Sequence, residues 1–191
     1  MRRKKCKACG EMFIPDRPMQ KTCPKYECAI TVGRQISKQA ERRADRAKRL
    51  AIKTMSQLKA EAQKEFNAYI RLRDADRPCI SCGRHHLGQW HAGHYLTTAA
   101  HPELRYDPRN CHKQCAPCNN HLSGNIVAYR QGLVARYGSP LVEWLEGPHQ
   151  PKRYTRDDLI AEAAKWRKLA RMLRDANDSM EAAREINFEL P

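Results

Sequence analysis

The residues of this sequence with the plainest chemical use are its nine cysteines. All but one form closely spaced pairs, and the pairs make two sets of four: Cys6-x2-Cys9 with Cys23-x4-Cys28, and Cys79-x2-Cys82 with Cys115-x2-Cys118. Structural zinc is held by four ligands in a tetrahedron, and short-spaced cysteine pairs supply them on two turns. The sequence therefore predicts two structural zinc sites. Four thiolates on each ion leave no position for a reactive water.

Disulfides are the other use of paired cysteines, and the cellular compartment decides between the two. The chain begins Met-Arg-Arg-Lys-Lys with no apolar stretch behind it, and no apolar run approaches the roughly 18 residues of a membrane span. We therefore expect a cytoplasmic protein, in which thiols stay reduced and metal binding is favoured. Cys111 is left over and is expected to be a small buried apolar residue.

Histidines and asparagines lie between and after the cysteines of the second set. The segment His91-Ala-Gly-His94 is followed by Asn110 and by Asn119, which comes directly after the last cysteine. The order His94, Asn110, Asn119, enclosed by two Cys-x2-Cys pairs, resembles the HNH or ββα-metal nuclease motif over residues 79–124. It is especially similar to the endonuclease VII type of phage junction resolvase.

This resemblance implies a role for each residue. His94 would be the general base that deprotonates the attacking water, because neutral imidazole is available near pH 7. Asn119 would hold a catalytic divalent cation, with His91 as second ligand where the resolvases carry Asp. Asn110 would brace the loop that aims His94. Such a site suits Mg²⁺ or Mn²⁺, and a histidine ligand would also admit Ni²⁺ or Zn²⁺.

The spacing of the two histidines leaves the ligand set open. In a regular strand His91 and His94 point to opposite faces, so a bulge at Gly93 would be needed to bring both into one site. His112 and His121 are alternative ligands.

A wider resemblance covers almost the whole chain. It rests on the basic first cysteine pair, the Lys/Arg-rich helix, the Cys79-Ile-Ser-Cys-Gly83 segment and the His91-Ala-Gly-His-Tyr95 segment. These look like the lambdoid phage recombination protein family NinG, also called Rap. The resemblance implies a Mg²⁺- or Mn²⁺-dependent, structure-specific endonuclease that cuts D-loops and Holliday junctions in the host cytoplasm. Host or phage recombination proteins would be further partners.

The charge of the chain indicates a polyanionic partner. The net charge is +15, and residues 1–75 hold 20 of the 36 basic residues but only 8 of the 21 acidic ones. DNA is the favoured partner and an acidic membrane the competing one. The DNA-contacting residues are expected in the first half of a long helix over 34–75: Arg34, Lys38, Arg42, Arg43, Arg46, Lys48 and Arg49.

The remaining pattern gives the elements that must position these residues. Residues 83–114 are typical of a loop-rich β-hairpin, and Asn119–Tyr137 of a helix that Gly138 and Pro140 end. Thr155-Arg-Asp-Asp158 is a variant capping box. It opens a helix with one apolar side, formed by Leu159, Ala163, Trp166, Ala170 and Leu173.

The predicted fold class is a small, helix-rich α+β protein with a zinc-stapled ββα-metal (HNH) core. We expect a zinc-ribbon-like module (1–33), a long basic helix (34–75), a nuclease core (76–147) and a C-terminal helical region (148–191). The predicted activity is phosphodiester hydrolysis in branched DNA. A non-catalytic zinc-dependent nucleic-acid-binding protein and an HNH nuclease of ordinary duplex are the alternatives. A homodimer would most simply explain symmetric cutting of a junction.

Overall fold

The computed structural model describes the backbone of residues 2–188 and the side chains of residues 2–179. It divides into two compact units, Met1–Lys53 and Thr54–Pro191, called here the N-terminal and C-terminal units. The end of the predicted region 148–191 lies outside the described residues. In fold class the chain is a small, helix-rich α+β protein, as predicted. Within the described residues, no helix has the length and apolar character that a membrane span requires.

The N-terminal unit is built around its cysteines. A short antiparallel pair, β1 (Lys4–Lys5) and β2 (Met12–Phe13), precedes the long helix α1 (Tyr26–Ala51). Its core consists of Phe13 and three of the four cysteines. So few apolar residues cannot stabilise a fold by burial alone, which indicates that a bound metal would supply much of the folding free energy.

The prediction of one continuous helix over residues 34–75 is wrong. α1 ends at Ala51, and a second helix, α2, runs from Met55 to Arg73. Thr54 separates them because it caps α2: its hydroxyl accepts from the backbone N–H of Gln57 at 3.2 Å, and its own N–H donates to Oε1 of Gln57 at 2.9 Å. The absence of proline and glycine permits a continuous helix, but this reciprocal cap favours a new start.

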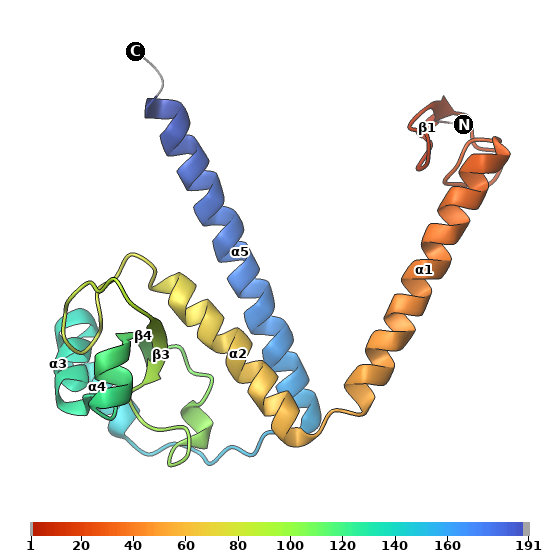
Figure 1. Ribbon diagram of the computed structural model, residues 1–191. Coiled ribbons are helices and arrows are strands. Elements are labelled where there is room, and N and C mark those ends of the chain that lie inside the picture. Colours follow the sequence, from red (N-terminus) through yellow and green to blue (C-terminus); the bar gives the residue numbers. More distant parts are fainter. Residues whose placement is uncertain (1, 189–191) are drawn as a thin grey trace. The chain divides into compact units, whose positions relative to one another are not determined.

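In the C-terminal unit, α2 packs along the helix α5 (Arg156–Phe188), as Figure 1 shows. The Phe66 ring meets the edge of Trp166 at a centroid distance of 4.9 Å. Arg167 of α5 bonds to Glu61 and Glu65 of α2. The predicted apolar side of the helix is therefore confirmed as a helix–helix contact; its buried residues are Leu159, Ala163, Trp166 and Ala170.

The Thr155 cap of α5 is confirmed as well. Its N–H donates to Asp158 Oδ2 at 2.8 Å, while its hydroxyl accepts from the Asp158 N–H at 3.2 Å. Asp thus replaces Glu in the reciprocal cap.

The predicted hairpin consists of β3 (Trp90–His94) and β4 (Cys111–Cys115), which pair antiparallel. A 3-10 turn, Pro102–Leu104, lies in the long connection between them. The helix α2 packs against this hairpin. On the other face, Tyr129 of α3 (Ile126–Tyr137) donates its hydroxyl hydrogen to the carbonyl of Gly93. The hairpin therefore lies between two helices, and its faces have different neighbours.

The helix predicted over Asn119–Tyr137 needs two corrections. Asn119 lies on a π-helical turn, Pro117–His121, and α3 begins only at Ile126, after left-handed Ser123, Gly124 and Asn125. Gly138 (φ 86°) does end α3, but Pro140 opens a further helix, α4 (Ser139–Glu146). A proline in the first helical turn loses no hydrogen bond, so Pro140 favours a start as readily as an end.

The main core of the C-terminal unit joins the segment after β3 to α3 and α4. Its buried residues are Ile80, Tyr95, Leu104, Tyr129, Leu133, Val142 and Leu145.

Candidate metal centres and hydrolytic site

Both predicted cysteine sets are brought together by the fold. The sulfur atoms of Cys6, Cys9, Cys23 and Cys28 lie within 4.8 Å of one another, and so do those of Cys79, Cys82, Cys115 and Cys118. The sulfurs of Cys9 and Cys23 are 3.8 Å apart, and those of Cys82 and Cys115 are 3.9 Å apart. A tetrahedral zinc with bonds of about 2.3 Å puts its sulfurs about 3.8 Å apart. Both clusters could therefore hold a zinc ion.

Cys111 stands outside these clusters, as expected. Its side chain is completely buried, and burial raises the pKa of its thiol well above the ordinary value. It lies on the same strand as Cys115, four residues earlier, and faces His94 across the hairpin. A thiol that stays protonated in apolar surroundings is a packing residue rather than a ligand or nucleophile.

His94 lies on the face of the hairpin that α2 covers. Its ring is 5.8 Å from that of Phe66. Its Nε2 is 2.9 Å from the carbonyl oxygen of Arg105, and since a carbonyl only accepts, Nε2 carries the hydrogen. Nδ1 then bears the lone pair and lies 3.7 Å from the sulfur of Cys111. Burial lowers the pKa of His94, so the ring is neutral at pH 7.

Asn110 fixes the segment that follows His94. Its side-chain oxygen accepts from the Leu96 N–H at 2.8 Å, and its amide donates to the Leu96 carbonyl at 2.9 Å. Its backbone carbonyl accepts from the Tyr95 N–H at 2.8 Å. These bonds hold the end of β3 against β4.

His91, Gly93 and Asn119 are associated with the opposite face. The pairing runs residue by residue from Trp90 opposite Cys115 to His94 opposite Cys111, so the bulge that would bring both histidines to one face does not form. His91 and Gly93 therefore point away from the face of His94. The structure does not place the ring of His94 and the amide of Asn119 on the same face of the hairpin.

Gln114 is a residue of this second face that the sequence reasoning missed. It pairs with His91 across the hairpin and is completely buried. A Cβ atom on Gly93 would lie 2.1 Å from the Gln114 Oε1 and 3.0 Å from the Asn119 Oδ1, so both oxygens border the space that this glycine leaves. The one sequence feature that could have indicated Gln114 is its polarity in a strand whose two faces are both covered.

The polar atoms at this place have the donor chemistry that the predicted cation site would require. In the described part of the chain, neither Oε1 of Gln114 nor Nε2 of His91 has a hydrogen-bond partner, although both atoms are buried. Amide oxygens are ligands that Mg²⁺ and Mn²⁺ accept. A cation bound between these side chains would give the buried oxygen of Gln114 and the buried nitrogen of His91 a partner.

Of the two alternative histidine ligands, His112 lies on the face of Gln114, opposite Gly93. Nδ1 of His112 donates to the hydroxyl of Tyr129 at 3.1 Å, because that hydroxyl gives its own hydrogen to the Gly93 carbonyl at 2.8 Å. Burial lowers the pKa of His112 to about 3. His121 is exposed at the end of the π-helical turn. His112 is thus a neutral structural residue.

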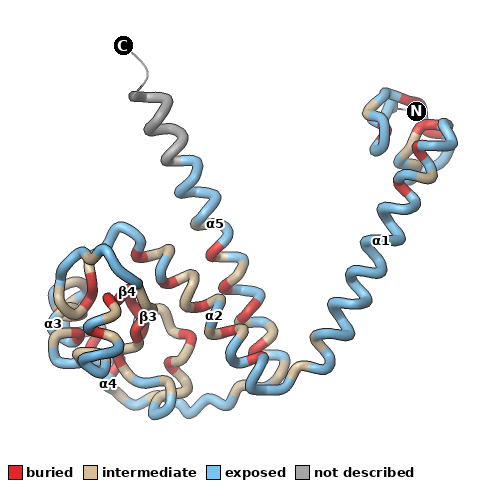
Figure 2. Tube along the Cα trace, in the orientation of Figure 1, coloured by how far each residue is buried: buried red, intermediate tan, exposed pale blue. Residues whose placement is uncertain are grey.

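The predicted DNA-contacting residues lie on a fully exposed stretch of α1. Every residue from 33 to 49 is exposed, as Figure 2 shows. Seven basic and two acidic side chains lie within residues 34–49. Arg34, Lys38, Arg42 and Arg46 recur every fourth residue and share one side of the helix. The residues of α1 that are buried in the described part of the chain, Cys28 and Val32, both precede this stretch.

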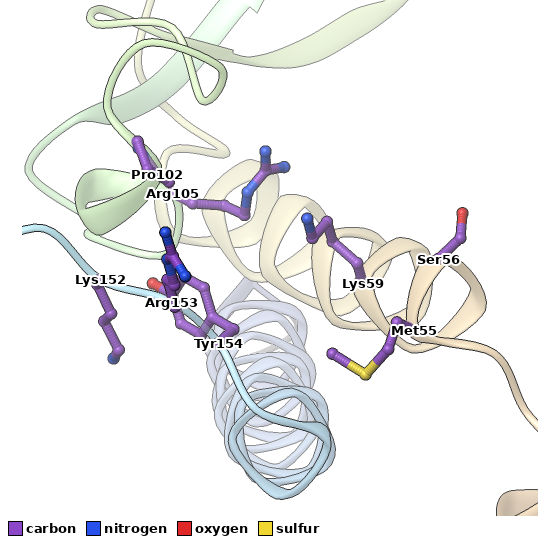
Figure 3. A pocket seen from close by; sticks show the side chains of 8 residues that line it. All are labelled: Met55, Ser56, Lys59, Pro102, Arg105, Lys152, Arg153 and Tyr154. Carbon is purple, nitrogen blue, oxygen red and sulfur yellow. The ribbon is translucent and has the colours of Figure 1, made fainter.

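A second basic region is a pocket of about 480 Å³ in the C-terminal unit. Figure 3 shows its lining: Met55, Ser56, Lys59, Pro102, Arg105, Lys152, Arg153 and Tyr154. Four of these are cationic, and no acidic residue belongs to this described lining. The first turn of α2 adds the positive end of a helix dipole. Arg105 is also the residue whose carbonyl holds His94.

Comparison with known proteins gives the family. The model of the family "Bacteriophage Lambda NinG protein" matches residues 1–176. Protein ninG of Escherichia phage 933W is 41% identical over 95% of this chain and 98% of its own length. Protein ninG of Escherichia phage lambda is 38% identical over 95% and 97%. No solved structure matches. The chain belongs to the phage NinG protein family.

Proposed function

We propose that this protein is an HNH-type, divalent-cation-dependent endonuclease that hydrolyses phosphodiesters in branched DNA. The observation that carries the proposal is the arrangement of two adjacent residues of β3. His94 supplies a neutral imidazole with a fixed tautomer, and the oxygens of Gln114 and Asn119 lie against the neighbouring residue, Gly93. A base and two oxygens that could hold a hard cation thus lie within one residue of each other along β3.

In this proposal His94 accepts the proton of the attacking water at Nδ1. The bond from Nε2 to the Arg105 carbonyl keeps the lone pair at Nδ1 and stabilises the imidazolium that forms. Asn110 prevents the strand end from shifting. A Mg²⁺ or Mn²⁺ ion held by Asn119, with His91 nearby, would supply charge stabilisation for the phosphate when bound.

The basic regions provide the grip on DNA. The exposed helix α1 neutralises phosphates without reading bases, and the pocket around Lys59 and Arg105 receives a backbone phosphate near His94. Branched DNA, rather than linear duplex, is proposed from the resemblance to junction resolvases. Cleavage of a labelled four-way junction and of a linear duplex of the same sequence, each with Mg²⁺ or with chelator, tests activity and branch preference together.

Charge reversal on α1 is expected to weaken DNA binding. In Arg42→Glu/Arg46→Glu, two phosphate contacts become repulsive, so affinity should fall at least about tenfold at 0.1 M salt. The slope of log K against log salt should become less steep by about 1.8. Band shifts at several salt concentrations measure both. The exposed pair Glu41→Gln/Asp45→Asn is the control and should bind at least as tightly as the wild type; an unchanged slope in the reversed variant would reject α1 as a DNA contact.

Removing positive charge from the pocket of the C-terminal unit should also reduce DNA affinity. Lys152→Ala/Arg153→Ala removes two exposed cations of the lining and is expected to lower junction affinity several-fold, without altering zinc content. The control is Lys168→Ala on α5, an exposed lysine outside the pocket. Fluorescence anisotropy with a labelled junction compares the three proteins. Equal affinities would mean that DNA does not enter the pocket.

A non-catalytic, zinc-dependent DNA-binding protein is the second candidate. The contact between Nδ1 of His94 and Cys111, and the separation of His94 from Asn119 by the strand, favour it. The two candidates share the zinc clusters and the basic regions, and they differ in whether His94 is needed for cutting.

A further inference from the structure

The space beside Gly93 is bordered by two oxygens that are both presented as acceptors. Nε2 of Gln114 donates to the Ser81 hydroxyl at 2.7 Å and to the Gly124 carbonyl at 2.6 Å, which leaves Oε1 pointing toward Gly93. The Asn119 amide nitrogen donates to Oδ1 of Asn120 at 2.7 Å, and this bond leaves Oδ1 of Asn119 on the same side. The orientation of each amide is therefore set by bonds made elsewhere.

Two acceptors that face one space need something positive between them. Gln114 is completely buried and its Oε1 has no partner in the described part of the chain, and an unsatisfied buried acceptor destabilises the fold. Nε2 of His91, the cross-strand neighbour of Gln114, is likewise buried and unpartnered there. A hard divalent cation, which takes oxygen ligands and tolerates an imidazole, would meet this need.

The backbone is shaped around the same place. Any side chain at position 93 would overlap Oε1 of Gln114, so glycine is required for the oxygen to lie there. Asn119 is presented by a π-helical turn, and such turns often occur at functional sites. The carbonyl that orients Gln114 belongs to Gly124, which has a left-handed backbone with φ of 89°.

We propose that Gln114 is a ligand of the divalent cation, and that its side-chain oxygen and that of Asn119 form the seat of the ion in the space beside Gly93. The inference rests on the proposed function for the identity of the ion. It adds Gln114 to the ligands that the sequence predicted, because His91 and His94 cannot both reach one site. His91, the cross-strand neighbour of Gln114 on the same face, would then be an additional ligand rather than the main one.

The test is Mn²⁺ binding to the full-length, zinc-loaded protein, followed by electron paramagnetic resonance. Gln114→Glu puts a carboxylate at the seat and should tighten Mn²⁺ binding at least about tenfold. Gln114→Met removes the oxygen at similar size and should weaken binding at least about tenfold. Gly93→Ala should weaken it through crowding. His112→Gln, on the same strand and face, is the matched control and should bind Mn²⁺ like the wild type.

Zinc content and the thermal unfolding curve verify that each variant is folded. If Gln114→Met loses its fold, the Gln114→Glu comparison decides: Glu keeps the size, the acceptor oxygen and a bond to the Ser81 hydroxyl, and loses the donation to the Gly124 carbonyl. Unchanged Mn²⁺ affinity in Gln114→Glu, or a wild-type protein that binds no Mn²⁺ because water fills the space, would overturn the proposal. If Mn²⁺ binding depends on Gln114 but no DNA is cleaved, the ligand role of Gln114 is supported and the nuclease is rejected. If DNA is cleaved but Mn²⁺ binding does not depend on Gln114, the nuclease is supported and the ligand role is rejected.

Discussion

Cys115→Ser is expected to reduce the zinc content from two ions to one per chain and to unfold the hairpin. The sulfur of Cys115 lies 3.9 Å from that of Cys82, and its cluster joins the segment before β3 to the end of β4. A structural zinc contributes about 10–16 kcal/mol of apparent binding free energy. This is comparable with the roughly 5–15 kcal/mol by which a whole domain is stable, so the small core cannot compensate for a lost ligand.

The measurements are zinc content by atomic absorption and thermal unfolding followed by circular dichroism. Cys111→Ser is the matched control, because Cys111 is equally buried and lies on the same strand. It should keep two zinc ions and lose only about 1–3 kcal/mol, the cost of burying a hydroxyl. Two ions in Cys115→Ser, or one ion in Cys111→Ser, would contradict the assignment of the ligands.

His94→Ala is expected to abolish cleavage of a four-way junction while leaving junction binding intact. A positioned general base contributes about 10²- to 10⁴-fold to the rate, and the imidazole of His94 has its tautomer fixed by Arg105. The basic residues of α1 and of the pocket are unchanged, so affinity should remain. Single-turnover cleavage of a labelled junction with Mg²⁺ measures the rate, and band shifts measure binding.

Truncation at position 94 also removes a ring that contacts Phe66, so a second variant is needed. His94→Gln can retain an N–H donor at the place of Nε2 for the Arg105 carbonyl and supplies no base, so it should remain folded and inactive. His121→Ala changes an exposed histidine of the same unit and should cut at the wild-type rate. Cleavage by His94→Gln at the wild-type rate would mean that His94 is not the general base.

Local patterns in the sequence determined the elements that depend on neighbours along the chain. The paired cysteines predicted both clusters because two short turns with two thiols each can hold a tetrahedral zinc ion. Three further features also depend on residues that are close together in the sequence and were predicted from it. They are the Thr155–Asp158 cap, the hairpin and the apolar side of α5. The prediction of one continuous helix was wrong because the cap at Thr54 starts a second helix. Composition alone does not show whether a helix continues through such a residue or begins again there.

The composition of the candidate site, by contrast, was decided only by the tertiary structure. The sequence selected His91, His94, Asn110 and Asn119 by order and spacing, but strand pairing determines which side chains share a face, and the pairing has no bulge at Gly93. Gln114 belongs to no recognisable sequence motif, because a single glutamine in a strand indicates no particular function. It becomes a candidate ligand only because Ser81 and Gly124, distant along the chain, take its hydrogens and turn its oxygen toward Asn119.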